Sequence, residues 1–187
     1  MKLLSIVLTS MLSFSALAGE SNHIIGGNVG YGGQDFEAAN GEEYGGGDSV
    51  GIDVYYRYML NDNFGLEGSV FSGSGGVASV FTSFFSTVDN ISYKGVRAAV
   101  YAQVPLSASN SLYAKLGASA NQLNYDVSGV FGSGTTESIE TDGTDFYGAV
   151  GWGIRFQSGV GLNLEYQYVP IQELIVQNFS IGVSYQF

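Results

Sequence analysis

The stretch Phe179-Ser180-Ile181-Gly182-Val183-Ser184-Tyr185-Gln186-Phe187 decides the fold. Every odd position carries a large apolar side chain, and every even position carries a small or polar one. Because successive side chains of a β-strand point to opposite faces, one face of this segment meets an apolar medium and the other does not. The alternation therefore predicts a half-buried strand at the end of the sequence.

Seven earlier segments show the same alternation less strictly. They are separated by short turns at 61–63, 105–111 and 157–159 and by longer connections at 34–47, 72–90, 122–143 and 169–174. The segments are 24–33, 48–60, 64–71, 96–104 at the end of a fourth strand, 112–119, 146–156 and 160–168. Short turns on one side and long loops on the other are typical of outer-membrane barrels. The sequence thus predicts an all-β fold, an eight-stranded antiparallel up-and-down transmembrane β-barrel, with both termini on the periplasmic side.

The first 18 residues are typical of a secretory signal peptide. Lys2 supplies a positive charge, an apolar stretch follows over 3–17, and Ala16-Leu17-Ala18 forms a small-x-small cleavage site. We expect cleavage after Ala18, so that residues 1–18 are the signal peptide and residues 19–187 form the barrel domain. No cysteine follows the site, which excludes lipoprotein processing.

Composition narrows the class of protein. The chain has no cysteine, 2 prolines and 28 glycines, and aromatic residues make up 14% of it, as expected for many short strands joined by turns. Beyond the signal peptide no apolar run reaches the ~18 residues that a spanning helix needs. The 17 acidic residues outnumber the 6 basic ones and give a net charge of -11, which excludes a nucleic-acid partner.

Charged side chains follow the alternation as well. Four of the five cations that remain after cleavage fall on the face opposite the apolar one, and only Lys94 does not. A cation on the lipid side costs about 2–4 kcal/mol near the membrane midplane. Eight strands enclose just enough space for their side chains, so we expect a polar core held by ion pairs, without a continuous pore. The predicted lumen charge network comprises Asp53, Arg57, Glu67, Arg97, Lys115, Arg155 and Glu165.

The sequence offers few residues that could form a catalytic site or a metal site. The only histidine, His23, falls at the periplasmic start of the first strand, away from the outer rim where barrel hydrolases hold their base. With no cysteine and one histidine, a zinc site is excluded, and the acidic loop residues lack Ca²⁺-loop spacing. We therefore predict no enzymatic activity, no cofactor and no metal site.

One connection allows two interpretations. Val77, Phe81, Phe84, Phe85 and Val88 recur at helical spacing, with serine and threonine between them. They predict either a short amphipathic helix that lies on lipid or docks a partner, or a hairpin in which the third and fourth strands continue above the membrane.

With its export signal, its eight alternating segments, Leu164-Glu165-Tyr166-Gln167-Tyr168 and the terminal Tyr185-Gln186-Phe187, the chain resembles the OmpA-like, OmpX-type small outer-membrane barrels. In that family a terminal phenylalanine with apolar residues at alternate preceding positions is the signal for the barrel assembly machinery. The matching residues here are Phe179, Ile181, Val183, Tyr185 and Phe187. Because nothing follows Phe187, we expect a barrel-only relative without the peptidoglycan-binding domain.

The resemblance implies an integral protein of the outer membrane of a Gram-negative bacterium, with a structural, surface-contact or adhesion role through its extracellular loops. Its implied partners are outer-membrane lipid and lipopolysaccharide, the barrel assembly machinery and a host or cell-surface partner, and the barrel is a monomer. Two alternatives stay open: a small gated channel or porin for ions or small solutes, and a soluble periplasmic carrier of lipocalin type.

Overall fold

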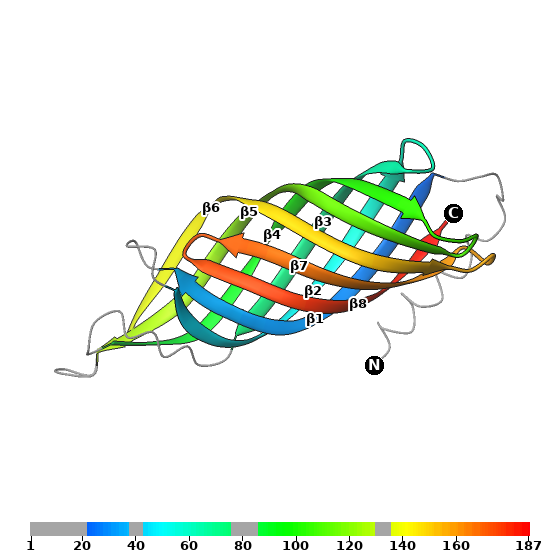
Figure 1. The fold of residues 1–187 in the computed structure, drawn as a ribbon. Helices are drawn as coiled ribbons and strands as arrows, with labels where there is room; N and C mark the ends of the chain where they lie inside the picture. The colour runs from blue at the N-terminus through cyan, green and yellow to red at the C-terminus, as the bar shows by residue number, and fades with distance from the viewer. Residues whose placement is uncertain (1–21, 38–42, 76–85, 130–135) are drawn as a thin grey trace, which may run out of the picture.

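Eight antiparallel strands close into one barrel (Figure 1). The computed structural model describes residues 22–37, 43–75, 86–129 and 136–187. Each strand pairs with its neighbours in the sequence, and β1 also pairs with β8, which confirms the predicted fold class. The strands are β1 (His23–Glu37), β2 (Glu43–Met59), β3 (Phe64–Gly75), β4 (Ser86–Pro105), β5 (Asn110–Gly129), β6 (Thr136–Arg155), β7 (Val160–Ile171) and β8 (Leu174–Gln186). Within the described residues, no helix is long and apolar enough to cross a membrane.

Residues 179–186 of the terminal stretch lie in β8, which closes the barrel. Its outward residues pair with those of β1, as in Tyr31↔Phe179 and Ile25↔Tyr185. Closure leaves no open edge along this seam, so the backbone N–H and C=O groups are satisfied without water. A barrel of this kind can therefore stand in an apolar medium.

Three tight turns and both ends of the barrel chain share one end of the molecule, which we call the short-turn end (Figure 1). In the β2–β3 turn, Asn61 Oδ1 accepts the backbone N–H groups of Asn63 and Phe64, each at 2.9 Å. In the β6–β7 turn, Gly159 has a φ of 84°, a conformation that favours glycine. The backbone N–H of Phe187 donates to the carbonyl of His23 at 3.0 Å, which ties the last residue to the first strand.

At the opposite end, called here the long-loop end, the predicted strand limits were wrong. β3 continues to Gly75 and β4 begins at Ser86, within the connection predicted over 72–90. β5 continues to Gly129 and β6 begins at Thr136, within the one predicted over 122–143. β1 and β2 likewise extend into 34–47. Of residues 77–88, for which either a helix or a continued hairpin was predicted, residues 77–85 lie outside the described residues, and Val88 belongs to β4.

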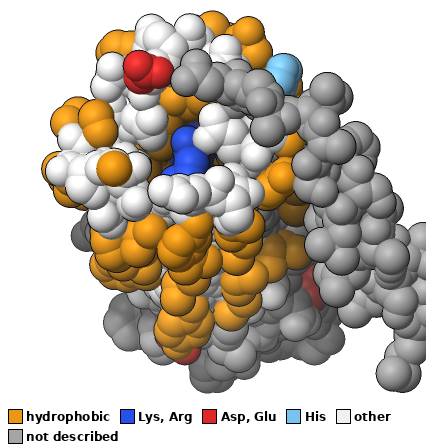
Figure 2. Space-filling model, turned by 90° about the vertical axis from the view of Figure 1, so that its right-hand side faces the viewer, with side chains coloured by type: hydrophobic (Ala, Val, Ile, Leu, Met, Phe, Trp, Pro, Cys, Tyr) orange, Lys and Arg blue, Asp and Glu red, His pale blue; other side chains and the backbone are white. Residues whose placement is uncertain are grey.

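The outer wall of the barrel is apolar over a continuous band. Figure 2 shows hydrophobic side chains covering the wall beside the short-turn end. On β8 alone, Phe179 and Ile181 are 66% and 69% exposed. Towards the long-loop end the outward residues become polar, as at Lys94 on β4, Gln122 on β5 and Asp142 on β6. The apolar band therefore ends within these strands, and their segments nearest the long-loop end extend beyond it.

The inward face changes in the opposite sense. In the middle of the barrel it carries buried charged residues, whereas towards the long-loop end it carries buried apolar ones. A polar core throughout was predicted, and at this end the prediction was wrong. The apolar layer there comprises Phe36, Ile91, Tyr93, Leu123, Val169, Ile171, Leu174 and Val176, and it continues to Phe71, Ala99, Tyr147 and Ala149 beside the charged residues.

Candidate functional site

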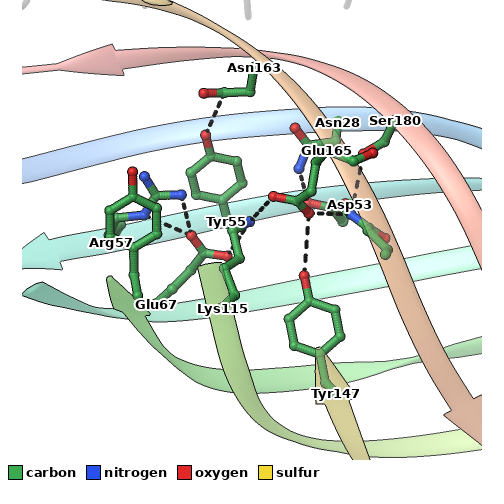
Figure 3. Close-up of polar contacts among 12 residues, drawn as sticks. Asn28, Asp53, Tyr55, Arg57, Glu67, Lys115, Tyr147, Asn163, Glu165 and Ser180 are labelled. Carbon is green, nitrogen blue, oxygen red and sulfur yellow. Dashed lines mark hydrogen bonds and ion pairs between the residues drawn. The ribbon is translucent and has the colours of Figure 1, made fainter. Parts of the chain in front are cut away.

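The centre of the lumen is built around one lysine between two carboxylates (Figure 3). Lys115 Nζ lies 2.8 Å from Glu67 Oε1 and 2.8 Å from Glu165 Oε2, so β5 is joined across the lumen to β3 and β7. All three side chains are buried. Because charges removed from water are stable only with close partners, Glu165 depends on this lysine, which it shares with Glu67.

Arg57 on β2 extends the chain of ion pairs towards the short-turn end. Its Nε and Nη2 both donate to Glu67 Oε2, at 2.8 and 2.6 Å. Its guanidinium also lies over aromatic rings, 3.6 Å from the ring centre of Tyr101 and 5.0 Å from that of Tyr55. The planar guanidinium thus meets a carboxylate at its edge and an aromatic ring at its face, a combination open to arginine but not to lysine.

Asp53 belongs to the same network through neutral side chains. Its Oδ1 accepts from Asn28 Nδ2 at 2.8 Å, and its Oδ2 accepts from Gln167 Nε2 at 3.2 Å. Gln167 Nε2 also donates to Glu165 Oε1 at 2.7 Å, and the Tyr147 hydroxyl donates to the same oxygen at 3.4 Å (Figure 3). The amide of Gln167 therefore connects two carboxylates that would otherwise repel each other.

Two of the predicted network residues stand apart from these ion pairs. Arg97 is buried and lies over aromatic rings, 3.7 Å from the ring centre of Phe71 and 4.5 Å from that of Tyr147. Arg155 is half-buried near the short-turn end. Among the residues that the structure describes, the ion pairs join Arg57, Glu67, Lys115 and Glu165, and neither of these arginines takes part.

The neutral members of the network were missed at the sequence level. Asn28, Gln167 and Tyr147 hold the carboxylates, yet only the charged residues were singled out. The available signal was the alternation itself, because polar side chains at inward positions need partners inside the barrel. Together the charged and neutral groups link β1, β2, β3, β5, β6 and β7 into a rigid polar layer.

The residues predicted as an assembly signal all lie on or near the outer wall. Phe179, Ile181 and Val183 are exposed, Tyr185 is half-buried and Phe187 is exposed beside His23, with 5.9 Å between their ring centres. The predicted cleavage site after Ala18 lies outside the described residues. Within the described ranges, no group of three or more acidic or histidine side chains could hold a metal ion.

Solved structures of small surface barrels share this fold. Ail, the attachment invasion locus protein of Yersinia pestis, aligns with a TM-score of 0.56 and 20% identity, over 90% of this chain and 100% of that one. Neisserial surface protein A aligns with a TM-score of 0.62 and 12% identity, over 90% and 99%. At these identities the likeness shows the fold alone.

The family follows from a comparison of sequences. No curated protein matches the chain significantly. The family model described as the outer membrane protein beta-barrel domain matches residues 4–187, nearly the whole chain. With its closed eight-stranded barrel and apolar outer wall, the chain belongs to this family of outer-membrane β-barrel proteins.

Proposed function

We propose that this outer-membrane barrel is a non-catalytic surface-contact protein that presents its long-loop end to partners outside the cell. The observation that carries the proposal is the extension of β4, β5 and β6 beyond the apolar band (Figure 1). Loops and strand ends on a rigid barrel are a common place for binding residues. In this orientation both termini and the short turns face the periplasm.

The packing of the lumen supports a contact role over a transport role. Ion-paired side chains fill the middle, and a layer of large apolar side chains fills the long-loop end. Ions or solutes would have to displace both layers to pass. This argues against the channel alternative, and the apolar outer wall over a charged interior argues against a soluble carrier, whose wall would meet water.

The chemistry of the extension indicates what kind of partner it suits. Its described outward acids include Glu140, Asp142 and, at the β7–β8 turn, Glu173, while Lys94 is the one outward cation among the described residues. One structure of Ail holds the heparin analogue sucrose octasulfate. An acidic surface repels such a polyanion, so we propose a neutral or cationic surface partner for this protein.

Adherence of bacteria that display the barrel tests the proposal. Cells carrying it should adhere to a host-cell layer more than cells with an empty vector do, and heparin should not compete. The double variant Glu140→Gln, Asp142→Asn removes two outward charges and should change adherence several-fold. Asp62→Asn removes an exposed acid at the short-turn end and should leave adherence unchanged. Equal adherence of displaying and empty-vector cells would refute the surface-contact role.

The proposal also covers the export of the chain and its assembly into the outer membrane. We propose cleavage after Ala18, and recognition of Phe187, Tyr185, Val183, Ile181 and Phe179 by the barrel assembly machinery. Three of these side chains project well into the surrounding medium, where a binding partner can reach them. Deletion of Phe187 should therefore lower the amount of barrel in the outer membrane, measured on gels before and after boiling.

A further inference from the structure

A polar hollow at the short-turn end contains a half-buried arginine that the lumen network does not use. The hollow has a volume of about 130 Å³ and lies between the ends of β4, β5, β6 and β7 and the β4–β5 turn. Figure 2 looks onto this end and shows Lys or Arg side-chain atoms at the bottom of the opening. Its lining includes Arg155, Ser107, Ser109, Asn110, Asn163 and Ser184.

Arg155 has no anionic partner within the described part of the chain. None of the ion pairs includes it, and no hydrogen bond of its guanidinium to another described side chain is found. Arg57 lies near enough to repel it electrostatically, and the Arg57 guanidinium is already bound to Glu67. The hollow is therefore a place of net positive charge in a chain whose overall charge is -11.

The remaining lining groups are suited to hydrogen bonds with oxygen. Ser107 Oγ accepts the backbone N–H groups of Ser109 and Asn110, at 3.3 and 3.2 Å, and Asn110 Nδ2 at 2.9 Å. Because its lone pairs are engaged by donors, the hydroxyl proton of Ser107 is left to donate. Asn163 Nδ2 donates to the Tyr55 hydroxyl at 3.1 Å, which fixes a further amide at the wall of the hollow.

We propose that this hollow binds a small oxyanion, of the phosphate or carboxylate type, on Arg155. A guanidinium offers parallel N–H donors that match two oxygens of such a group, and the neighbouring hydroxyls and amides supply single donors. The opening faces the same end as the termini, so the ligand comes from the periplasmic solution or from a lipid headgroup at that membrane surface.

Titration of the barrel in zwitterionic lipid nanodiscs tests this site. Inorganic phosphate and acetate are added separately at constant ionic strength, and the amide resonances of Gly153 and Gly161, which line the hollow, are followed by NMR. We expect saturable shifts with at least one of the two ions. Shifts that stay linear in concentration for both ions, together with no response to an anionic lipid headgroup, would overturn the proposal.

Two variants and a matched control assign the binding to the arginine. Arg155→Gln should weaken binding at least about tenfold, since a charged hydrogen-bonding group is lost. Arg155→Lys keeps the positive charge but lacks the paired N–H donors of the guanidinium, so it should weaken binding less than Arg155→Gln does. This variant replaces Arg155→Gln in the test if the glutamine variant fails to fold. Lys94→Gln removes one exposed cation from the other end and should leave binding unchanged. Equal affinity in wild type and in whichever Arg155 variants fold would contradict the assignment.

A final titration arm separates the two sources of the oxyanion. In nanodiscs containing phosphatidylglycerol and no added salt of phosphate or acetate, the same resonances shift if a headgroup occupies the hollow. If they shift only with the dissolved ions, the ligand is a periplasmic solute. Both results support the site and identify its occupant, whereas resonances that respond in neither arm exclude it.

Discussion

Two stretches of β4 follow opposite rules. Within the apolar band, Val96 and Val100 point outward, and Arg97 points into the lumen. A few residues towards the long-loop end, Lys94 points outward and Ile91 is buried inside. The strand keeps its register with β3 and β5 from Ser92 to Val100, and its alternation continues to Ile91, so the chemistry of the two faces is exchanged without a change of strand order.

This exchange of apolar and polar faces indicates that the medium outside the barrel determines which face is apolar. Where hydrocarbon surrounds the wall, apolar groups face out, and the charged groups of the chain must lie inside. Where water surrounds it, the strands pack as in a soluble barrel, with apolar side chains inside. We therefore propose that the membrane boundary crosses β4, β5 and β6 near Lys94, Gln122 and Thr144.

The largest effect is expected in the charged layer. Lys115→Met leaves the buried Glu165 without its cation and Glu67 with Arg57 alone, so we expect a loss of about 3–5 kcal/mol in the free energy of unfolding. Urea unfolding of the barrel in lipid vesicles, followed by the fluorescence of the single tryptophan, Trp152, measures it. Lys94→Met, on the exposed outer face, should stay within about 0.5 kcal/mol.

Removal of Glu165 together with Lys115 tests the cause of that loss. In the double variant Lys115→Met, Glu165→Gln, Glu67 keeps its ion pair with Arg57, and the lysine substitution no longer leaves a carboxylate without a cation, so much of the stability should return. Equal losses for Lys94→Met and Lys115→Met would show that the central layer does not depend on its ion pairs.

The apolar layer should respond to cavities instead. Leu123→Ala removes a fully buried side chain on β5, and we expect a loss of about 2–5 kcal/mol. The next residue, Asn124, points outward, and Asn124→Ala should change stability by less than about 0.5 kcal/mol. The same unfolding assay applies, and similar losses for the two variants would contradict a packed lumen at this end.

An arginine placed on the outer face locates the boundary directly. Val150→Arg puts a cation within the apolar band of β6 and should cost about 2–4 kcal/mol. Thr144→Arg lies on the same face of the same strand, at the proposed boundary, and should cost about 0–1 kcal/mol. Indistinguishable costs would place both residues in the same medium.

The same exchange of faces explains what the sequence could predict. Within the apolar band, outward Val, Leu and Phe alternate with inward charges, and this pattern identified all eight strands and the inward side of Arg57 and Lys115. Beyond the band, outward residues are polar and inward ones apolar, so Leu123 seemed part of a long loop. The predicted strands were therefore too short at the long-loop end.

The partners within the lumen were harder to anticipate. A charged residue within an alternating segment can be assigned to the lumen because it must be kept from lipid. A neutral polar residue such as Asn28 or Gln167 could equally lie in a loop. Which carboxylate meets which cation depends on the stagger of strands around the closed barrel. The oxyanion hollow combines a strand end with two turns, and no short-range pattern brings those together.

The smallest effect concerns the closing turn of the apolar layer. Asp145 Oδ2 accepts the backbone N–H of Gln172 at 2.9 Å, its Nε2 at 3.1 Å and Asn121 Nδ2 at 3.0 Å. Pairing of β6 with β7 ends at Gly148, so this carboxylate holds the β7–β8 turn where the ladder no longer does. Asp145→Asn should cost about 1–2 kcal/mol and speed hydrogen exchange at Gln172. Gln172→Gly keeps the backbone hydrogen bond to Asp145 and suits the φ of 56°, so its cost in the free energy of unfolding should be smaller. Unchanged hydrogen exchange at Gln172 in Asp145→Asn would show that the turn holds without the carboxylate.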